Sequence, residues 1–245
     1  MKSVVDTEQD FAEATYRNSN GVVVTTMWSD LDADAVAAGA PWRKFPWYLG
    51  QRNYSGVYWC ATEGALVGYE SHLELSHLVM ADFEQSVKRI ASQPFQLRFR
   101  ANGVIHRRVP DYLLCTDKGP VVIDVVRARR LHDPEVRQTL AMTCRVIESR
   151  GWLYEIVSDP LPVRYLNIRF LSGYRRPWQF DPEVVAAVAA AARTGAGLTV
   201  RDIVARTPHA KPAALATVMH LLWQQRFTAD LTKRLSPATA VEVAS

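Results

Sequence analysis

The chain has 245 residues, 48% of them hydrophobic, which suffices for a packed core and favours two domains over one. Lysine and arginine outnumber aspartate and glutamate by 29 to 25, a mildly basic balance that is compatible with a polyanionic partner but does not establish one. The three cysteines, Cys60, Cys115 and Cys144, form no C-x-x-C pair, so neither a disulfide framework nor a zinc knuckle is indicated.

No apolar run reaches the length of a membrane span, and residues 1–30 lack the pattern of a signal peptide. We therefore expect a cytoplasmic protein with no membrane partner. Changes in composition predict three parts: an N-terminal arm with an aromatic-rich lead-in over 1–67, a mixed α/β domain over 68–171, and a small helical domain over 172–245.

The signals for the middle part follow one another along the chain. Ser71 and Glu74 form a capping-box pattern that predicts the start of a helix. Asn102-Gly103 predicts a tight turn between strands over 95–100 and 104–109, and a third strand over 112–115 can pair with them as a meander.

The apolar run 121–126 is typical of a central strand that is buried on both faces. Asp133-Pro134 opens a helix that ends near Gly151, and a further strand follows over 152–157. Together these elements predict a mixed sheet with flanking helices.

After a polar linker over 172–181, three helices are expected near 181–193, 199–204 and 208–223. A small hairpin over 226–235 would follow the third helix. This order suggests a winged-helix-like domain, although the third helix is mainly apolar and serves protein contact as readily as base recognition.

Three acidic residues occupy positions that suit a metal-dependent nuclease: Glu74 in the first turns of a helix, Asp111 after the hairpin, and Asp124 within the buried strand. A carboxylate in an apolar strand is costly unless it is hydrogen-bonded, paired or bound to a metal. Oxygen ligands without histidine or cysteine favour Mg²⁺, with Mn²⁺ as a substitute. Each residue also has a purely structural interpretation, as a helix cap, a turn aspartate and a hydrogen-bonded core acid respectively.

Four short motifs occur in order: 69–74 (YESHLE), 93–95 (QPF), 109–112 (VPDY) and 122–125 (VIDV). In order and spacing they resemble the amino-terminal domain of the TnsA family of transposase endonucleases. The resemblance implies a restriction-endonuclease-like fold of the PD-(D/E)xK group, in which Glu74, Asp111 and Asp124 would be the Mg²⁺ ligands. It also implies cleavage at the 5′ ends of a mobile element, together with a TnsB-like DDE recombinase and a TnsC-like AAA ATPase.

The family pattern has a lysine two residues after the strand acid, and this position is Val126. Arg127 is a candidate substitute if a β-bulge turns it toward Asp124, and Arg108 is another. A guanidinium binds phosphate but does not exchange protons as a lysine does. The alternative is therefore a degenerate, non-cleaving subunit that serves as an assembly scaffold.

Arginines on the two strands of the predicted hairpin can follow a phosphate backbone beside the site, or can form an ordinary solvated face. They are Arg98, Arg100, Arg107 and Arg108. A third hypothesis, a winged-helix DNA-binding regulator, leaves the buried Asp124 unexplained.

Overall fold

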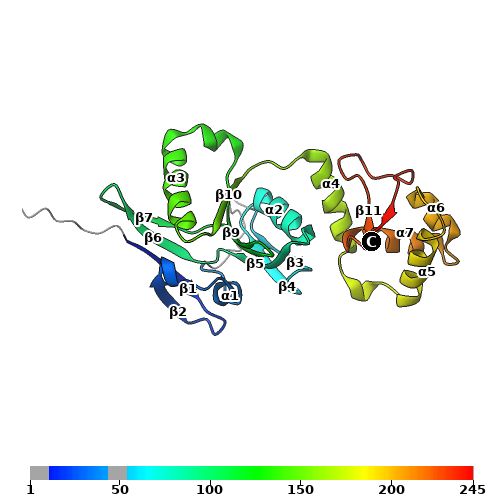
Figure 1. The fold of residues 1–245 in the computed structure, drawn as a ribbon, viewed down its shortest axis with the longest axis horizontal. Coiled ribbons are helices and arrows are strands. Elements are labelled where there is room, and N and C mark those ends of the chain that lie inside the picture. The colour runs from blue at the N-terminus through cyan, green and yellow to red at the C-terminus, as the bar shows by residue number, and fades with distance from the viewer. Residues whose placement is uncertain (1–10, 44–53, 245) are drawn as a thin grey trace, which may run out of the picture. The chain divides into compact units, whose positions relative to one another are not determined.

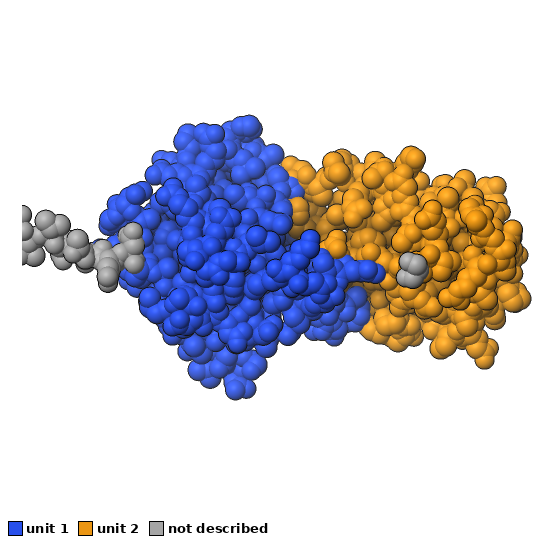
Figure 2. Space-filling view, in the orientation of Figure 1, with its two compact units in different colours: residues 1–75, 85–158 blue, residues 76–84, 159–245 orange. Residues whose placement is uncertain are grey.

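The computed structural model describes residues 11–43 and 54–244, and its α/β fold comprises two compact units (Figures 1 and 2). Unit 1 consists of residues 1–75 and 85–158, and unit 2 of residues 76–84 and 159–245. Within the predicted aromatic-rich lead-in, residues 44–53 lie outside the described residues, as do residues 1–10 of the predicted arm.

The first sheet of unit 1 is antiparallel, with the strand order β2-β1-β6-β7. Its strands are β1 (Ala12–Arg17), β2 (Val23–Met27), β6 (Gln96–Ala101) and β7 (Val104–Arg108). The predicted hairpin is confirmed: β6 and β7 pair across a turn in which Asn102 and Gly103 have φ values of 51° and 73°. Both residue types tolerate this left-handed conformation.

The second sheet is mixed, with the order β10-β9-β8-β5. Its strands are β5 (Val87–Ser92), β8 (Tyr112–Thr116), β9 (Gly119–Val125) and β10 (Leu153–Val157). The predicted central strand is confirmed, since β9 lies between β8 and β10 and Val122 is fully buried. Its connection to the parallel strand β10 includes the predicted helix α3 (Pro134–Glu148), whose first turn is capped by the Asp133 side chain.

The predicted meander is wrong, because β7 and β8 belong to different sheets. They are separated by Val109, Pro110 and Asp111, and a proline has no N–H to donate to a ladder. β8 pairs instead with β5, a strand that we did not predict.

Within the predicted N-terminal part, residues 11–43 belong to the folded unit and do not form an arm. β1 pairs with β6, so that Ala14 lies opposite Leu97, and both side chains are fully buried. Trp28 packs on Phe95 in the same core. Unit 1 also contains α1 (Ala33–Ala37), the hairpin of β3 (Gly56–Cys60) with β4 (Ala65–Tyr69), and the start of α2 (His72–Phe83).

Besides the part of α2 from Ser76 onward, unit 2 contains the three predicted helices and one more. They are α4 (Pro162–Leu171), α5 (Pro182–Ala192), α6 (Val200–Arg206) and α7 (Lys211–Trp223). The units therefore divide after Ser158, ahead of the predicted boundary at 171/172. The reason lies in Asn167 of α4, whose buried side chain bonds to the backbone of Leu231, Lys233 and Leu235.

The small sheet after α7 differs from the predicted hairpin over 226–235. β11 (Phe227–Thr228) pairs with β12 (Glu242–Val243), so the intervening loop spans residues 229–241. Among residues 11–43 and 54–244, no helix combines the length and the apolar character needed to cross a membrane.

Candidate functional site

One edge of the second sheet brings together the residues that the motifs selected. β9 ends at this edge, and the antiparallel β8 begins there, so Asp111 immediately before β8 lies beside the end of β9. The Asp111 N–H donates to the Ile123 carbonyl at 3.0 Å, and the Val125 N–H donates to Asp111 Oδ2 at 2.6 Å. The backbone of two paired strands therefore fixes the position of Asp111.

A cleft of about 560 Å³ opens in unit 1 at this edge. Its wall contains the three predicted carboxylates together with a fourth, Glu70, and it is also rich in arginine. The arginines are Arg43, Arg107, Arg108, Arg127, Arg129 and Arg130. Carboxylates beside guanidinium groups provide oxygen ligands for a hard cation and donors for a phosphate in one space.

Glu74 caps its own helix. Its N–H donates to Ser71 Oγ at 3.2 Å, while its carboxylate accepts from the Ser71 hydroxyl at 2.8 Å and from the Glu70 N–H at 2.7 Å. The predicted capping interaction is thus formed, with Glu70 as the backbone donor. Burial raises the pKa of Glu74 despite these hydrogen bonds. A carboxylate has about four acceptor positions, so capping leaves capacity for a further partner.

Asp111 is the most strongly perturbed acid in the cleft. Burial, followed by the negative charge of Glu74, raises its pKa from 3.8 to about 8, against the opposing hydrogen bond from Val125 and the charge of Arg108. Asp124 contributes further repulsion. The carboxylates are therefore close enough to disfavour one another's charge, as in sites that bind a cation or a proton.

Asp124 is 2% exposed and is hydrogen-bonded by two side chains. Its Oδ2 accepts from Arg108 Nη2 at 3.0 Å and from the Tyr154 hydroxyl at 2.5 Å. Burial and the Asp124 charge raise the pKa of Tyr154, which keeps the hydroxyl protonated as a donor. The burial of this carboxylate is thus compensated by an ion pair and a hydrogen bond.

The pairing of β9 with β10 is continuous through Val125, without the bulge on which the candidacy of Arg127 depended. Val126 is 9% exposed and belongs to the hydrophobic core of unit 1. Arg127 follows the end of β9, is exposed, and lies in the cleft wall. The ion-pair partner of Asp124 is Arg108, which comes from β7 in the other sheet.

The four hairpin arginines do not form one patch. Arg107 and Arg108 line the cleft. Arg98 instead pairs with Glu13 at 2.8 Å and lies 4.8 Å from the ring of Phe11. Arg100 also packs near Phe11, at 5.9 Å.

Sequence reasoning missed several residues of this site. Tyr154 lies opposite Val122 in the parallel pairing of β10 with β9. Residues two apart on a strand share a face, so Tyr154 is on the side of Asp124, which only the register of the two strands reveals. Arg129 and Arg130 could have been selected from the sequence, because they belong to the basic run 127–130 directly after the strand. No pattern of this kind includes Arg43.

No group of three or more histidine, cysteine, aspartate or glutamate side chains is arranged to hold a metal ion within residues 11–43 and 54–244. Asp124 already bonds to Arg108 and Tyr154, which leaves Glu70, Glu74 and Asp111 as the other carboxylates of the cleft. Of these, Glu74 is the one whose charge raises the pKa of Asp111.

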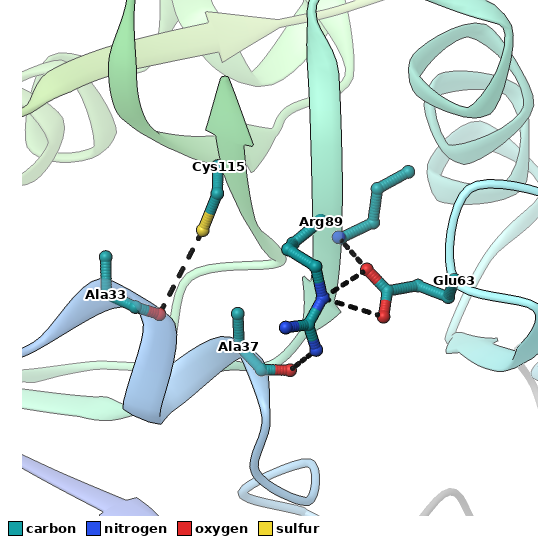
Figure 3. A network of polar contacts seen from close by, with 6 residues as sticks. Ala33, Ala37, Glu63, Arg89 and Cys115 are labelled. Atoms are coloured by element: carbon teal, nitrogen blue, oxygen red, sulfur yellow. Dashed lines mark hydrogen bonds and ion pairs between the residues drawn. The ribbon is translucent and has the colours of Figure 1, made fainter. Parts of the chain in front are cut away.

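A second polar cluster in unit 1 is structural (Figure 3). Glu63 accepts from Arg89 Nε at 3.2 Å and from the Ile90 N–H at 2.5 Å, and Arg89 donates to the Ala37 carbonyl at 3.1 Å. This network joins α1, β5 and the β3–β4 turn. Burial raises the pKa of the nearby Cys115 thiol to about 11, so that thiol is protonated and weakly reactive.

Comparison with known proteins adds no assignment: neither a protein-family model nor a curated protein matches the chain.

Proposed function

We propose that this chain is a metal-dependent DNA endonuclease subunit of a heteromeric transposase, similar to TnsA, with a restriction-endonuclease-like unit 1 and a winged-helix-like unit 2. The observation that carries the proposal is the single cleft that contains Glu74, Asp111 and Asp124 beside six arginines. The three acids come from separate motifs, selected by order and spacing, and lie on α2, before β8 and on β9.

Glu74 and Asp111 would hold the cation. Mg²⁺ in phosphoryl-transfer sites is commonly bound by one or two carboxylates, with waters and substrate phosphates as the other ligands. The carboxylates of Glu74 and Asp111 match this pattern of coordination. When bound, the metal would neutralise phosphate charge and lower the pKa of a bound water. Its binding would also relieve the repulsion between the two carboxylates.

Arg108 would take the place of the family lysine. Only one hydrogen bond from its guanidinium is directed to Asp124, so other donors remain for a phosphate oxygen. Asp124 and Tyr154 then act as positioning residues that hold Arg108 at the cleft. Because a guanidinium does not titrate near neutral pH, Arg108 stabilises charge and does not transfer protons.

A non-cleaving scaffold is the second candidate, and the Arg108–Asp124 ion pair favours it, because this pair occupies a carboxylate that the family pattern assigns to the metal. In both candidates a TnsB-like recombinase, a TnsC-like ATPase and DNA are the partners. A nicking assay on plasmid DNA carrying the element ends, with Mn²⁺ and the partner recombinase, separates the two. The nuclease predicts nicking that Asp111→Asn abolishes, whereas absence of nicking by the wild type supports the scaffold.

Val126→Lys tests the replacement of the lysine by Arg108 in the same assay. If Arg108 already supplies the positive charge, the added lysine changes the nicking rate by less than about tenfold. A gain of about 10² or more, the usual effect of one charge-stabilising donor, would mean that Arg108 does not fill the position.

A further inference from the structure

Several arginines that line the cleft have no ion-pair partner in the part of the chain that the structure describes. Arg127, Arg129 and Arg130 come from the segment around the 3₁₀ turn η2 (Ala128–His132), and Arg107 comes from β7. All four are exposed. Among the described residues, none of the four guanidinium groups forms an ion pair or a side-chain hydrogen bond, in contrast to Arg89, Arg98 and Arg108.

The segment that carries them is held at both ends. The Val126 N–H donates to the Val157 carbonyl at 2.8 Å, the Arg130 N–H to the Arg127 carbonyl at 2.8 Å, and the Asp133 N–H to the Arg130 carbonyl at 3.2 Å. Uncompensated like charges on an ordered turn repel one another, and a polyanion relieves that repulsion. A fixed backbone also reduces the ordering that binding requires.

We infer that Arg107, Arg127, Arg129 and Arg130 form the subsite for the phosphate backbone of the nucleic acid in the cleft, an inference that rests on the proposed function for the identity of the ligand. Arg98 and Arg100 are not part of this subsite, since they pack at the start of β1. Successive phosphates of a nucleic-acid strand can each contact a different guanidinium group, so a strand suits several arginines better than one small phosphate does.

Two acidic residues lie next to the proposed phosphate subsite. A smaller cavity of about 280 Å³ shares Arg130 and Arg108 with the cleft and is also lined by Asp133 and Glu135, at the start of α3. These carboxylates disfavour phosphate, so the backbone contacts end near Arg130.

The test measures binding of a DNA duplex to the full chain by fluorescence anisotropy in EDTA, over a series of KCl concentrations. The variant combines Arg127→Ala, Arg129→Ala and Arg130→Ala. Each lost phosphate contact lowers the slope of log affinity against log salt by about 0.9, so we expect a reduction of about 2–3 and at least tenfold weaker binding at low salt.

A matched control removes three exposed positive charges elsewhere in unit 1, with Arg137→Ala, Arg145→Ala and Lys118→Ala. The inference is overturned if the two triple variants show the same salt slope. It is also overturned if inorganic pyrophosphate displaces the DNA at equimolar phosphate, because the site would then take a small anion. No cleavage occurs in EDTA, so failure of the nuclease proposal in the nicking assay is a separate result.

Discussion

Asp111→Asn is expected to stabilise the protein, and to do so increasingly as the pH rises. Burial and the nearby carboxylates raise the pKa of Asp111 from 3.8 to about 8, so the folded protein retains a proton that the unfolded chain releases near pH 4. The free energy of unfolding of the wild type therefore falls as the pH rises between these two values. Asparagine is neutral throughout and still offers an oxygen to the Val125 N–H.

The size of the effect follows from the shift in pKa. The difference between about 8 and 3.8 is about four pKa units, and at about 1.4 kcal/mol for each unit the ceiling is about 6 kcal/mol. Water in the open cleft screens part of this charge, so we expect about 2–3 kcal/mol. This corresponds to a rise in Tm of about 5–10 °C.

Thermal unfolding in EDTA, followed by circular dichroism at about pH 4.5 and about pH 8.5, measures this difference. Asp117→Asn is the control, because Asp117 is a surface carboxylate with a 60% exposed side chain in an ion pair with Lys88. The reasoning is refuted if Asp111→Asn lowers the Tm at the higher pH, or if its effect is the same at both pH values.

Three further perturbations test the site, the second polar cluster of unit 1 and unit 2. Tyr154→Phe removes a donor to buried Asp124 and should lower the free energy of unfolding by about 1–3 kcal/mol in urea titrations; an unchanged value would show that Arg108 alone compensates that charge. Glu63→Gln, which discharges the partner of a half-buried arginine, should cost about 1–3 kcal/mol in the same measurement, and a variant as stable as the wild type would contradict the structural assignment of this network. Burial lowers the pKa of His220 below 6.5, so the wild type should lose stability as the pH falls below 6.5, and His220→Gln should reduce that loss in melts compared at about pH 5 and pH 7.

Short sequence patterns correctly predicted those helices, strands and turns that are determined by a few neighbouring residues. The Asn102-Gly103 turn, the Asp133 cap and the apolar run around Val122 each identify an element through backbone preference or burial, and each is present in the structure. The three motif acids likewise line one cleft.

Long-range pairing accounts for what the sequence did not predict. Pairing of β1 with β6 and of β5 with β8 joins segments far apart in the chain, and neither has a local signature. The Arg108–Asp124 pair depends on a change of sheet at Pro110. The contact of Tyr154 depends on the register of two parallel strands.

Calorimetric titration of Mn²⁺ into the full chain tests the central claim most directly. The account predicts that the wild type binds the ion, that Asp111→Asn remains folded and loses this binding, and that Asp117→Asn retains it. Absence of binding by the wild type, or equal binding by Asp111→Asn, would contradict the assignment of this cleft as a metal-dependent nuclease site.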